Sequence, residues 1–342
     1  MSAGVLVVIS GLLGAGDIKQ AQDAAHTSVA LYALMAAVMT VLGLLFVPQI
    51  LRLVQTPAAA MPEAKRYLYT VFAGTVFTFG YNLIGALQRG LGNAAASMSF
   101  VIISSAANIA LDAVFIVWLG MGAFGAALGT VLSQVAAFVI GTVQFARGGA
   151  ALRLSARAVR FHKKHLKNIL LFGVPTALNE VMVNLAMLTV SGVANSFGLA
   201  SSAAYGVGSR INSLAIFTDG AMNQTMSAYA SQNIGAGRQK RALEGLWKAI
   251  ILSAGAALGT SLLVLGFASE FSACFDSDPA VIEQSAAFLR VTVWSYPLFA
   301  TVGPLIGFIR GTGNVEASLL VGVVAQLCCR VPASFLFSRW MG

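Results

Sequence analysis

The chain has 342 residues, of which 58% are hydrophobic and 10% are charged. An ordinary soluble domain carries about 25% charged residues, so this composition excludes a soluble enzyme or binding domain and favours a membrane protein. The formal net charge is +9, but seven of the 21 Lys and Arg residues lie within residues 147–167. Such clustering is typical of a cytoplasmic loop and not of a nucleic-acid-binding face. The three cysteines form neither a disulfide framework nor a metal motif.

Apolar stretches long enough to cross a bilayer follow one another along almost the whole chain. Residues 1–13 are apolar but only about half a span long, and we interpret them as the end of a helix whose start is missing. Each later stretch has about 20 residues, the length that a helix needs to span the hydrocarbon core. The predicted fold is therefore all-α and integral to the membrane. The nine predicted spans are residues 29–51, 67–88, 97–119, 123–146, 169–192, 205–233, 248–268, 286–309 and 317–338.

The loops between these spans predict the orientation of the chain. Alternate loops carry most of the cations, and the positive-inside rule places those loops in the cytoplasm. The longest of them, 147–168, is predicted to be a basic cytoplasmic linker between an N-terminal lobe, 1–146, and a C-terminal lobe, 169–342. Its mixture of apolar and basic residues suggests an amphipathic helix on anionic headgroups. His162 and His165 have no carboxylate or cysteine nearby in the sequence, so we interpret them as solvated loop residues.

Two loop sequences recur at one spacing, which indicates an internal duplication. The run S-G-L-L-G-A-G-D-I-K-Q-A at 10–21 matches S-Q-N-I-G-A-G-R-Q-K-R-A at 231–242, and R-G-L-G-N-A-A-A-S at 89–97 matches R-G-T-G-N-V-E-A-S at 310–318. Both pairs are offset by 221 residues. Six helices separate each loop from its copy, so the two lobes are predicted to be parallel repeats, a scheme found in secondary transporters.

The duplication also predicts what the chain lacks. The first half has only residues 1–13 before its first repeated loop, whereas the second half has two spans there, 169–192 and 205–233. The span at 123–146 has no counterpart after 317–338. We therefore expect a twelve-helix parent, truncated here at both ends to about nine full transmembrane helices and an N-terminal half helix. We expect the chain as written not to transport by itself.

Seven short motifs follow one another along the whole chain: G-A-G-D at 14–17, Q-R-G-L-G-N at 88–93, N-I-A-L-D-A-V-F-I at 108–116, L-G-M-G-A-F-G-A-A-L-G-T at 119–130, G-V-P at 173–175, Q-N-I-G-A-G at 232–237 and G-F-I-R-G-T-G-N at 307–314. In this order and spacing they resemble the MATE (multidrug and toxin extrusion) family of transporters, bacterial branch. Resemblance to this family implies two six-helix lobes with a cleft that opens alternately to each side, and export of organic, often cationic, compounds in exchange for Na⁺ or H⁺.

Acidic side chains inside predicted spans are the best clue to chemistry, because a charge costs roughly 2.5–3.5 kcal/mol at a helix centre. Asn108 precedes Asp112 by one turn and shares its face, and the tight turn at 120–122 brings Thr130 to nearly the same depth. Their carboxylate, amide and hydroxyl oxygens would suit a small cation. The alternative is a hydrogen-bonded cluster that joins two helices, worth about 0.6 kcal/mol per bond. The family resemblance implies that these three residues match Na⁺-binding positions of the N-terminal lobe.

Two further acids, Glu180 and Asp219, lie within spans of the second lobe. Glu180 is roughly 16 Å deep by helical rise, and Asp219 is central in its span. Acids at these depths would attract a cationic substrate or carry a proton. The alternative is that each is a core acid, protonated or hydrogen-bonded to an asparagine. The asparagines available for this are Asn179, Asn184 and Asn223.

Together these features predict a secondary antiporter of the plasma membrane that exports drug-like compounds, uses no cofactor beyond the coupling ion, binds no nucleic acid and acts as a monomer in lipid. An ATP-driven pump would need a soluble nucleotide domain, and no stretch of this chain is long or polar enough to form one. An intramembrane enzyme would need catalytic groups or metal ligands in the spans, whereas His26, His162 and His165 lie in predicted loops. The alternative is a flippase for lipid-linked saccharides of the same superfamily. Its cleft would hold several cations, but here Arg330 alone lies well inside a span. A membrane scaffold would not explain the acids.

Overall fold

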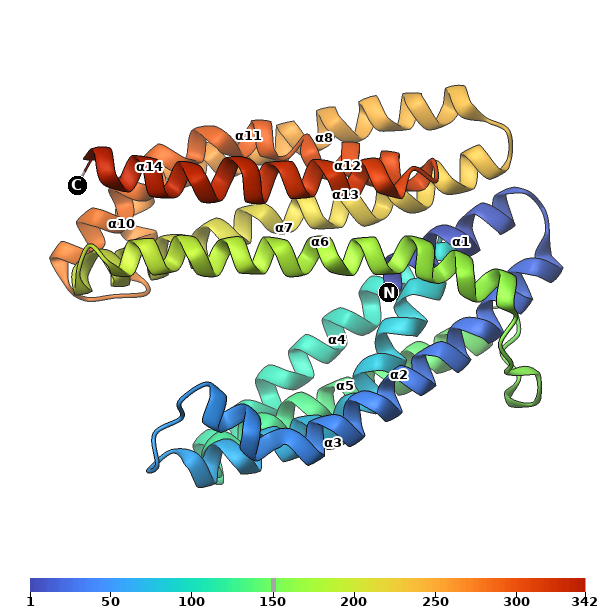
Figure 1. Ribbon diagram of the computed structural model, residues 1–342, viewed down its shortest axis with the longest axis horizontal. Coiled ribbons are helices and arrows are strands. Elements are labelled where there is room, and N and C mark those ends of the chain that lie inside the picture. Colours follow the sequence, from blue (N-terminus) through green and yellow to red (C-terminus); the bar gives the residue numbers. More distant parts are fainter. Residues whose placement is uncertain (149–151, 342) are drawn as a thin grey trace. The chain divides into compact units, whose positions relative to one another are not determined.

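The computed structural model of the chain describes residues 1–148 and 152–341, and in these residues it contains helices and no strand (Figure 1). Residues 149–151 of the predicted linker and residue 342 of the predicted C-terminal lobe lie outside the described residues. The chain forms two compact units, an N-terminal unit of residues 4–169 and a C-terminal unit of residues 170–342, with the first three residues divided between them.

In the N-terminal unit, α3 packs against α2 and α5, and α4 packs against α5. The turn between α4 and α5 is short because Gly120 and Gly122 adopt positive φ angles of 62° and 56°, which glycine tolerates best. Residues 152–162 are not the amphipathic helix that the sequence suggested, because in this described stretch the only helical element is a short 3₁₀ turn. The elements are α1 (Ser2–Gly14), α2 (Ile18–Leu53), α3 (Met61–Gly90), α4 (Ala94–Asp112), the π-helix η1 (Ala113–Trp118), α5 (Gly122–Arg147), the 3₁₀ turn η2 (Ala156–Ala158) and the start of α6 (Lys163–Asn195).

In the C-terminal unit, α12 packs closely along α7 because three glycines face it. An added Cβ at Gly303, Gly307 or Gly311 would meet atoms of α7, and small residues at this spacing let membrane helices approach closely. The predicted span at 286–309 is not one helix but α10, η3, α11 and α12. The elements of the C-terminal unit after α6 are α7 (Leu199–Gly235), α8 (Gln239–Gly266), α9 (Ala268–Ala273), α10 (Pro279–Thr292), η3 (Val293–Ser295), α11 (Tyr296–Phe299), α12 (Val302–Gly311), α13 (Val315–Val323), the π-helix η4 (Val324–Arg330) and α14 (Val331–Met341).

All nine predicted spans fall on helical segments, and within the described residues eight of these segments are long and apolar enough to cross a membrane. The remaining predicted span, 205–233, lies in α7, which has 37 residues and polar ones among them, such as Asp219 and Gln224. Residues 1–13 correspond to the short apolar helix α1. The fold is therefore all-helical and integral to the membrane, as the sequence predicted.

The turn geometry repeats at the spacing of the sequence duplication. Gly16 and Gly237, 221 residues apart, end corresponding loops with φ angles of 75° and 72°. Asn93 and Asn314, at the same spacing, each cap a helix by accepting a hydrogen bond of 3.1 Å from the backbone N–H three residues on. The repeated sequences therefore form the same local structures, because both sites need a left-handed glycine or a side-chain cap.

The close helix approach repeats as well. A Cβ added at Gly90 of α3 would lie 3.6 Å from the carbonyl oxygen of Leu6 in α1, and one at Gly311 of α12 would lie 2.8 Å from that of Ser227 in α7. Leu6 and Ser227 are also 221 residues apart. The pair α1 and α3 in the first half therefore corresponds to the pair α7 and α12 in the second, which supports the prediction of parallel repeats.

Candidate functional site

The carboxylate of Asp112 lies against α5. Asp112 is the last residue of α4, and an added Cβ at Gly129 would collide with its Oδ1 and would lie 3.4 Å from its backbone nitrogen. Gly129 therefore leaves the space that the carboxylate occupies, and it directly precedes Thr130 in the chain. The structure thus places the acid beside the segment of α5 that the sequence predicted to face it.

Two polar atoms at this place are buried and have no hydrogen-bond partner among the described residues. They are Oδ1 of Asp112 and Nδ2 of Asn108, one helical turn apart. The hydroxyl of Thr130 does not bridge them, because it donates to the carbonyl oxygen of Ala126 at 3.0 Å, although its oxygen can still act as a ligand. A buried acceptor without a donor costs roughly 1–3 kcal/mol, and more if it is charged, so a positively charged ligand bound here would stabilise this carboxylate.

Two features of this site were missed by the sequence reasoning. The carboxylate of Asp112 lies against Gly129. The sequence indicated this only by placing a glycine immediately before Thr130. The helix after Asp112 changes to the π-helical segment η1, a form that occurs frequently at functional sites. The apolar sequence of η1, A-V-F-I-V-W, carries no signal for this change.

The two acids of the second half have different surroundings. Oδ1 of Asp219 accepts the backbone N–H of Gly303 at 2.6 Å, so this carboxylate joins α7 to α12. Glu180 of α6 is exposed within its unit. Two of the three asparagines that might have bonded these acids act elsewhere: Asn223 accepts a hydrogen bond from Arg310 at 3.1 Å, and Asn184 donates to the backbone carbonyl of Glu180 at 2.8 Å. The third, Asn179, has a buried Oδ1 with no hydrogen-bond partner among the described residues.

Arg89 and Arg310, which the sequence placed in cytoplasmic loops, instead turn into the helix packing. Arg310 is 6% exposed, and Arg89 donates from Nη1 to the hydroxyl of Ser97 at 2.8 Å. Each residue lies in the last turn of its helix, α3 or α12, where a side chain points back along the helix towards its start. The Nε of both guanidiniums is buried without a partner among the described residues.

The histidines also differ from the prediction of solvated loop residues. His26 lies inside α2, and both it and His165 are 5% exposed. The Nε2 atom of His162 lies 3.6 Å from Oδ1 of Asp23, so a carboxylate that is distant in the sequence is its neighbour. Across the described parts of the chain, no three His, Cys, Asp or Glu side chains are grouped so that they could hold a metal ion.

Comparison with protein families gives one match over most of the chain. The model of the MatE family matches residues 1–114 and 175–336. The chain is 27% identical over 337 residues to the probable multidrug resistance protein YpnP of Bacillus subtilis, covering 98% of this chain and 75% of that protein. It is 23% identical over 335 residues to the multidrug export protein MepA of Staphylococcus aureus, covering 98% of this chain and 74% of that protein.

Solved structures share the fold. The outward-facing conformation of a multidrug resistance MATE family transporter matches with a TM-score of 0.92 at 23% identity, covering 99% of this chain and 76% of that one. A MOP superfamily transporter from Pyrococcus furiosus, described as having a binding pocket of reverse polarity, matches with a TM-score of 0.90 at 23% identity, covering the same 99% and 76%. These likenesses show the architecture of the chain.

Proposed function

The chain belongs to the MatE family, and from this premise we propose that it exports small organic molecules by antiport, in exchange for Na⁺ or H⁺. Members of this family are transporters and not enzymes. The chain is a multi-pass membrane protein, and in bacteria proteins of this family lie in the plasma membrane. The names of the relatives in Bacillus subtilis and Staphylococcus aureus, a multidrug resistance protein and a multidrug export protein, support drug-like substrates.

The observation that carries the coupling proposal is the buried, unpartnered Oδ1 of Asp112. We propose that a carboxylate in this position is stabilised either by a proton or by a small cation that the side-chain oxygens of Asn108 and Thr130 would also coordinate. Oxygen ligands are those that hard cations prefer. Because binding there would neutralise a charge inside the protein, ion occupancy would change the relative free energies of the transporter's conformations. This is the alternating-access coupling that we propose.

Glu180 is the better placed of the two second-half acids to meet a cationic substrate. Its side chain is exposed within its unit, whereas the carboxylate of Asp219 already accepts the N–H of Gly303. We propose that Glu180 attracts substrate or carries a proton, and that Asp219 mainly holds α7 and α12 together. We also propose that the transporter acts as a monomer and binds no nucleic acid.

A flippase for lipid-linked saccharides is the second candidate, and the buried guanidinium of Arg310 is the observation that favours it. A diphosphate would need such cations, and this one has no carboxylate within ion-pair distance among the described residues. However, Arg310 donates to Asn223 between α12 and α7, so its charge is directed into helix packing. Export of drugs therefore remains the better supported function.

Drug accumulation tests this proposal in pump-deficient cells that express the protein extended at both ends, which is the form expected to transport. Asp112→Asn should abolish the dependence of export on the Na⁺ or H⁺ gradient, and Glu180→Gln should reduce export of cationic compounds more than of neutral ones. Glu63→Gln provides a matched control, because this acid is exposed and lies 3.9 Å from Arg66 on the surface. Ion-dependent export by Asp112→Asn at the wild-type level would rule out the coupling site.

A further inference from the structure

The basic segment after α5 is fastened to the start of α2 by hydrogen bonds that use its backbone. We call residues 153–164 the strap. The side-chain amide of Gln22 pairs with the backbone of Arg153 in both directions: its Oε1 accepts the N–H at 2.7 Å, and its Nε2 donates to the carbonyl oxygen. Further along, the N–H of His162 donates to the hydroxyl of Thr27 at 3.2 Å. The strap is therefore held in one register on α2.

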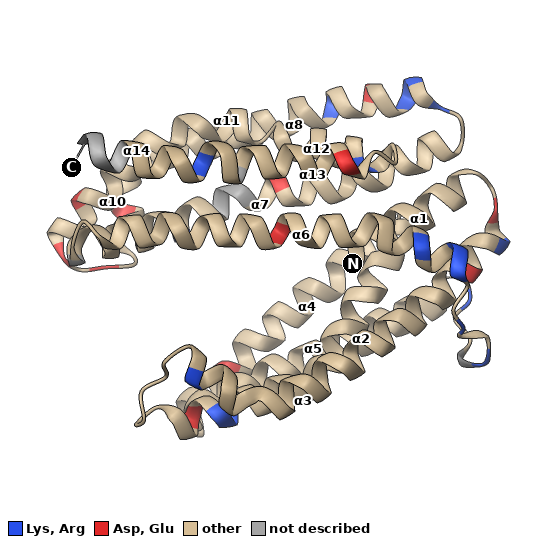
Figure 2. Cartoon of the chain, in the orientation of Figure 1, with Lys and Arg blue, Asp and Glu red and all other residues tan. Residues whose placement is uncertain are grey.

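This attachment leaves most of the basic side chains free. Arg160 donates to the ring of His162 and Lys164 to Gln20, but the other cations around the strap are exposed. No carboxylate lies within ion-pair distance of them in the described chain. Figure 2 shows Lys and Arg gathered at this end of the N-terminal unit. The free cations are Arg147, Arg153, Arg157, Lys163 and Lys167.

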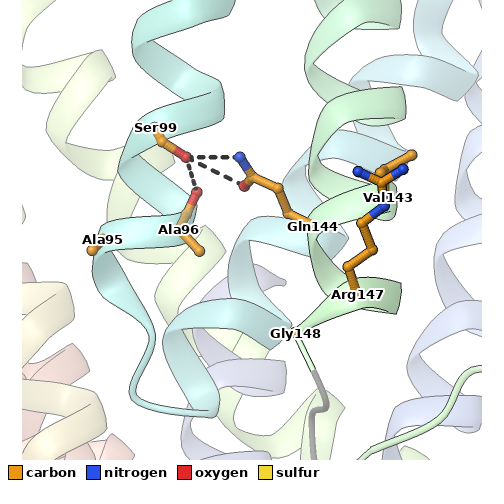
Figure 3. Close-up of a pocket in the computed structure, with 7 residues that line it drawn as sticks. All are labelled: Ala95, Ala96, Ser99, Val143, Gln144, Arg147 and Gly148. Carbon is orange, nitrogen blue, oxygen red and sulfur yellow. Dashed lines mark hydrogen bonds between the residues drawn. The ribbon is translucent and has the colours of Figure 1, made fainter.

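One of these cations, Arg147, lines an open pocket of about 500 Å³ between the start of α4 and the end of α5 (Figure 3). Ser99 and Gln144 bridge the two helices across the pocket, with Nε2 of Gln144 donating to the hydroxyl of Ser99 at 3.1 Å. The hydroxyl of Ser99 also donates to the carbonyl oxygen of Ala96 at 2.9 Å, in the first turn of α4. The remaining lining residues are Ala95, Ala96, Val143 and Gly148.

An apolar strip continues from the pocket along the same two helices, away from their cytoplasmic ends. Ile102 and Ile103 follow Ser99 by one turn of α4, and Val139 precedes Val143 by one turn of α5, so they share the pocket's face. All four aliphatic side chains are exposed, with Ile102 at 57% and Val139 at 51%. The face therefore has a cationic, hydrogen-bonding end and an apolar continuation.

From this layout we infer that the cytoplasmic end of the N-terminal unit binds an anionic phospholipid, with its phosphate at Arg147 and its acyl chains on the apolar strip. The polar groups of Ser99 and Gln144 face the headgroup. The free cations of the strap attract further anionic headgroups, since each cation near a membrane surface contributes about 1 kcal/mol to their binding. The location also fits, because this end of the helices is the one predicted to face the cytoplasmic leaflet.

Native mass spectrometry of the purified chain, mixed with equal amounts of phosphatidylglycerol and phosphatidylcholine, tests the inference. The wild type should retain phosphatidylglycerol preferentially, and Arg147→Ala should retain it about fivefold less well. Ala95→Phe should have a similar effect because the ring fills the pocket while the charge remains. Arg52→Ala, which removes an exposed arginine from the predicted outer side, should leave retention unchanged.

The outcomes distinguish a lipid site from a site for a small anion and from general attraction to surface charge. Equal thermal stability of the variants without added lipid shows that they fold. Wild-type retention by both Arg147→Ala and Ala95→Phe would overturn the inference, as would equal loss in Arg52→Ala. Displacement of the lipid by millimolar inorganic phosphate would identify the ligand as a small anion, and would overturn the role of the apolar strip.

Discussion

Replacing Gly129 with alanine tests the cation site without altering any of its proposed ligands. The new methyl group would collide with Oδ1 of Asp112, so the carboxylate has to rotate away from α5 or the helices have to separate. Overpacking of this kind costs about 1–3 kcal/mol. If the carboxylate rotates, the ion loses a charged interaction worth about 1.5–3 kcal/mol, which weakens its binding roughly tenfold to a hundredfold.

The assay is the thermal stability of the purified protein, titrated with Na⁺ at fixed pH and separately with pH at fixed salt. An ion that binds only the folded state raises the melting temperature as its concentration rises above its dissociation constant. The midpoint of that rise should shift to roughly tenfold to a hundredfold higher Na⁺ in Gly129→Ala, or to lower pH if the ion is H⁺. Asp112→Asn should remove the rise altogether.

Gly259→Ala in α8 is the matched control, because an added Cβ there meets no atom within 4 Å. It should leave the midpoint unchanged. A wild-type midpoint in Gly129→Ala, together with a lost response in Asp112→Asn, would refute the claim that the carboxylate must lie in the space above Gly129. Unchanged responses in both variants would refute the ion site itself.

Three further predictions concern the scaffold. Gly307→Ala should destabilise the fold by at least about 1–3 kcal/mol, measured by thermal unfolding, because the methyl group meets the carbonyl oxygen of Asn223, whereas Gly206→Ala, with open space, should not. Gln22→Ala removes two hydrogen bonds of about 1 kcal/mol each that hold the strap on α2. Tryptic cleavage of the strap should therefore become roughly 30-fold faster, and an unchanged rate would argue against attachment of the strap to α2. Hydrogen bonds from the first turn of α2 lower the pKa of the Asp17 carboxyl group. The ionised carboxylate therefore stabilises that turn fully above about pH 4. This stabilisation is lost as the pH falls through the lowered pKa of the folded protein. Hydrogen exchange of the turn should show this loss, and Asp17→Asn should keep the cap but remove its pH dependence.

The candidate site could be predicted in part. Asn108, Asp112 and Thr130 were predicted to lie at nearly one depth because a helix turn and a tight loop between antiparallel helices fix relative depth along the chain. Of this prediction, the structure bears out that Asp112 lies against α5. The sequence could not show that Thr130 would donate its hydrogen bond to Ala126, or that Gly129 would receive the carboxylate. Those features depend on the rotation of α5 about its own axis, which packing determines.

The membrane spans and the repeat could be predicted from the residues alone. Apolar length and charge position act locally, because lipid requires each helix to satisfy its own backbone, and the repeated loops need the same glycine and asparagine conformations wherever they occur. These features are therefore visible in composition and spacing alone.

Which polar groups are buried, and which partners they have, depends on the packing of distant helices. Arg89 and Arg310 look like loop cations, but each lies in the last turn of a helix whose side chains point back into the packing. His26 and His165 are covered because the strap and α2, which are more than 100 residues apart in sequence, hydrogen-bond to each other. Contacts of this range depend on how helices are placed together, and no local pattern of residues specifies that placement.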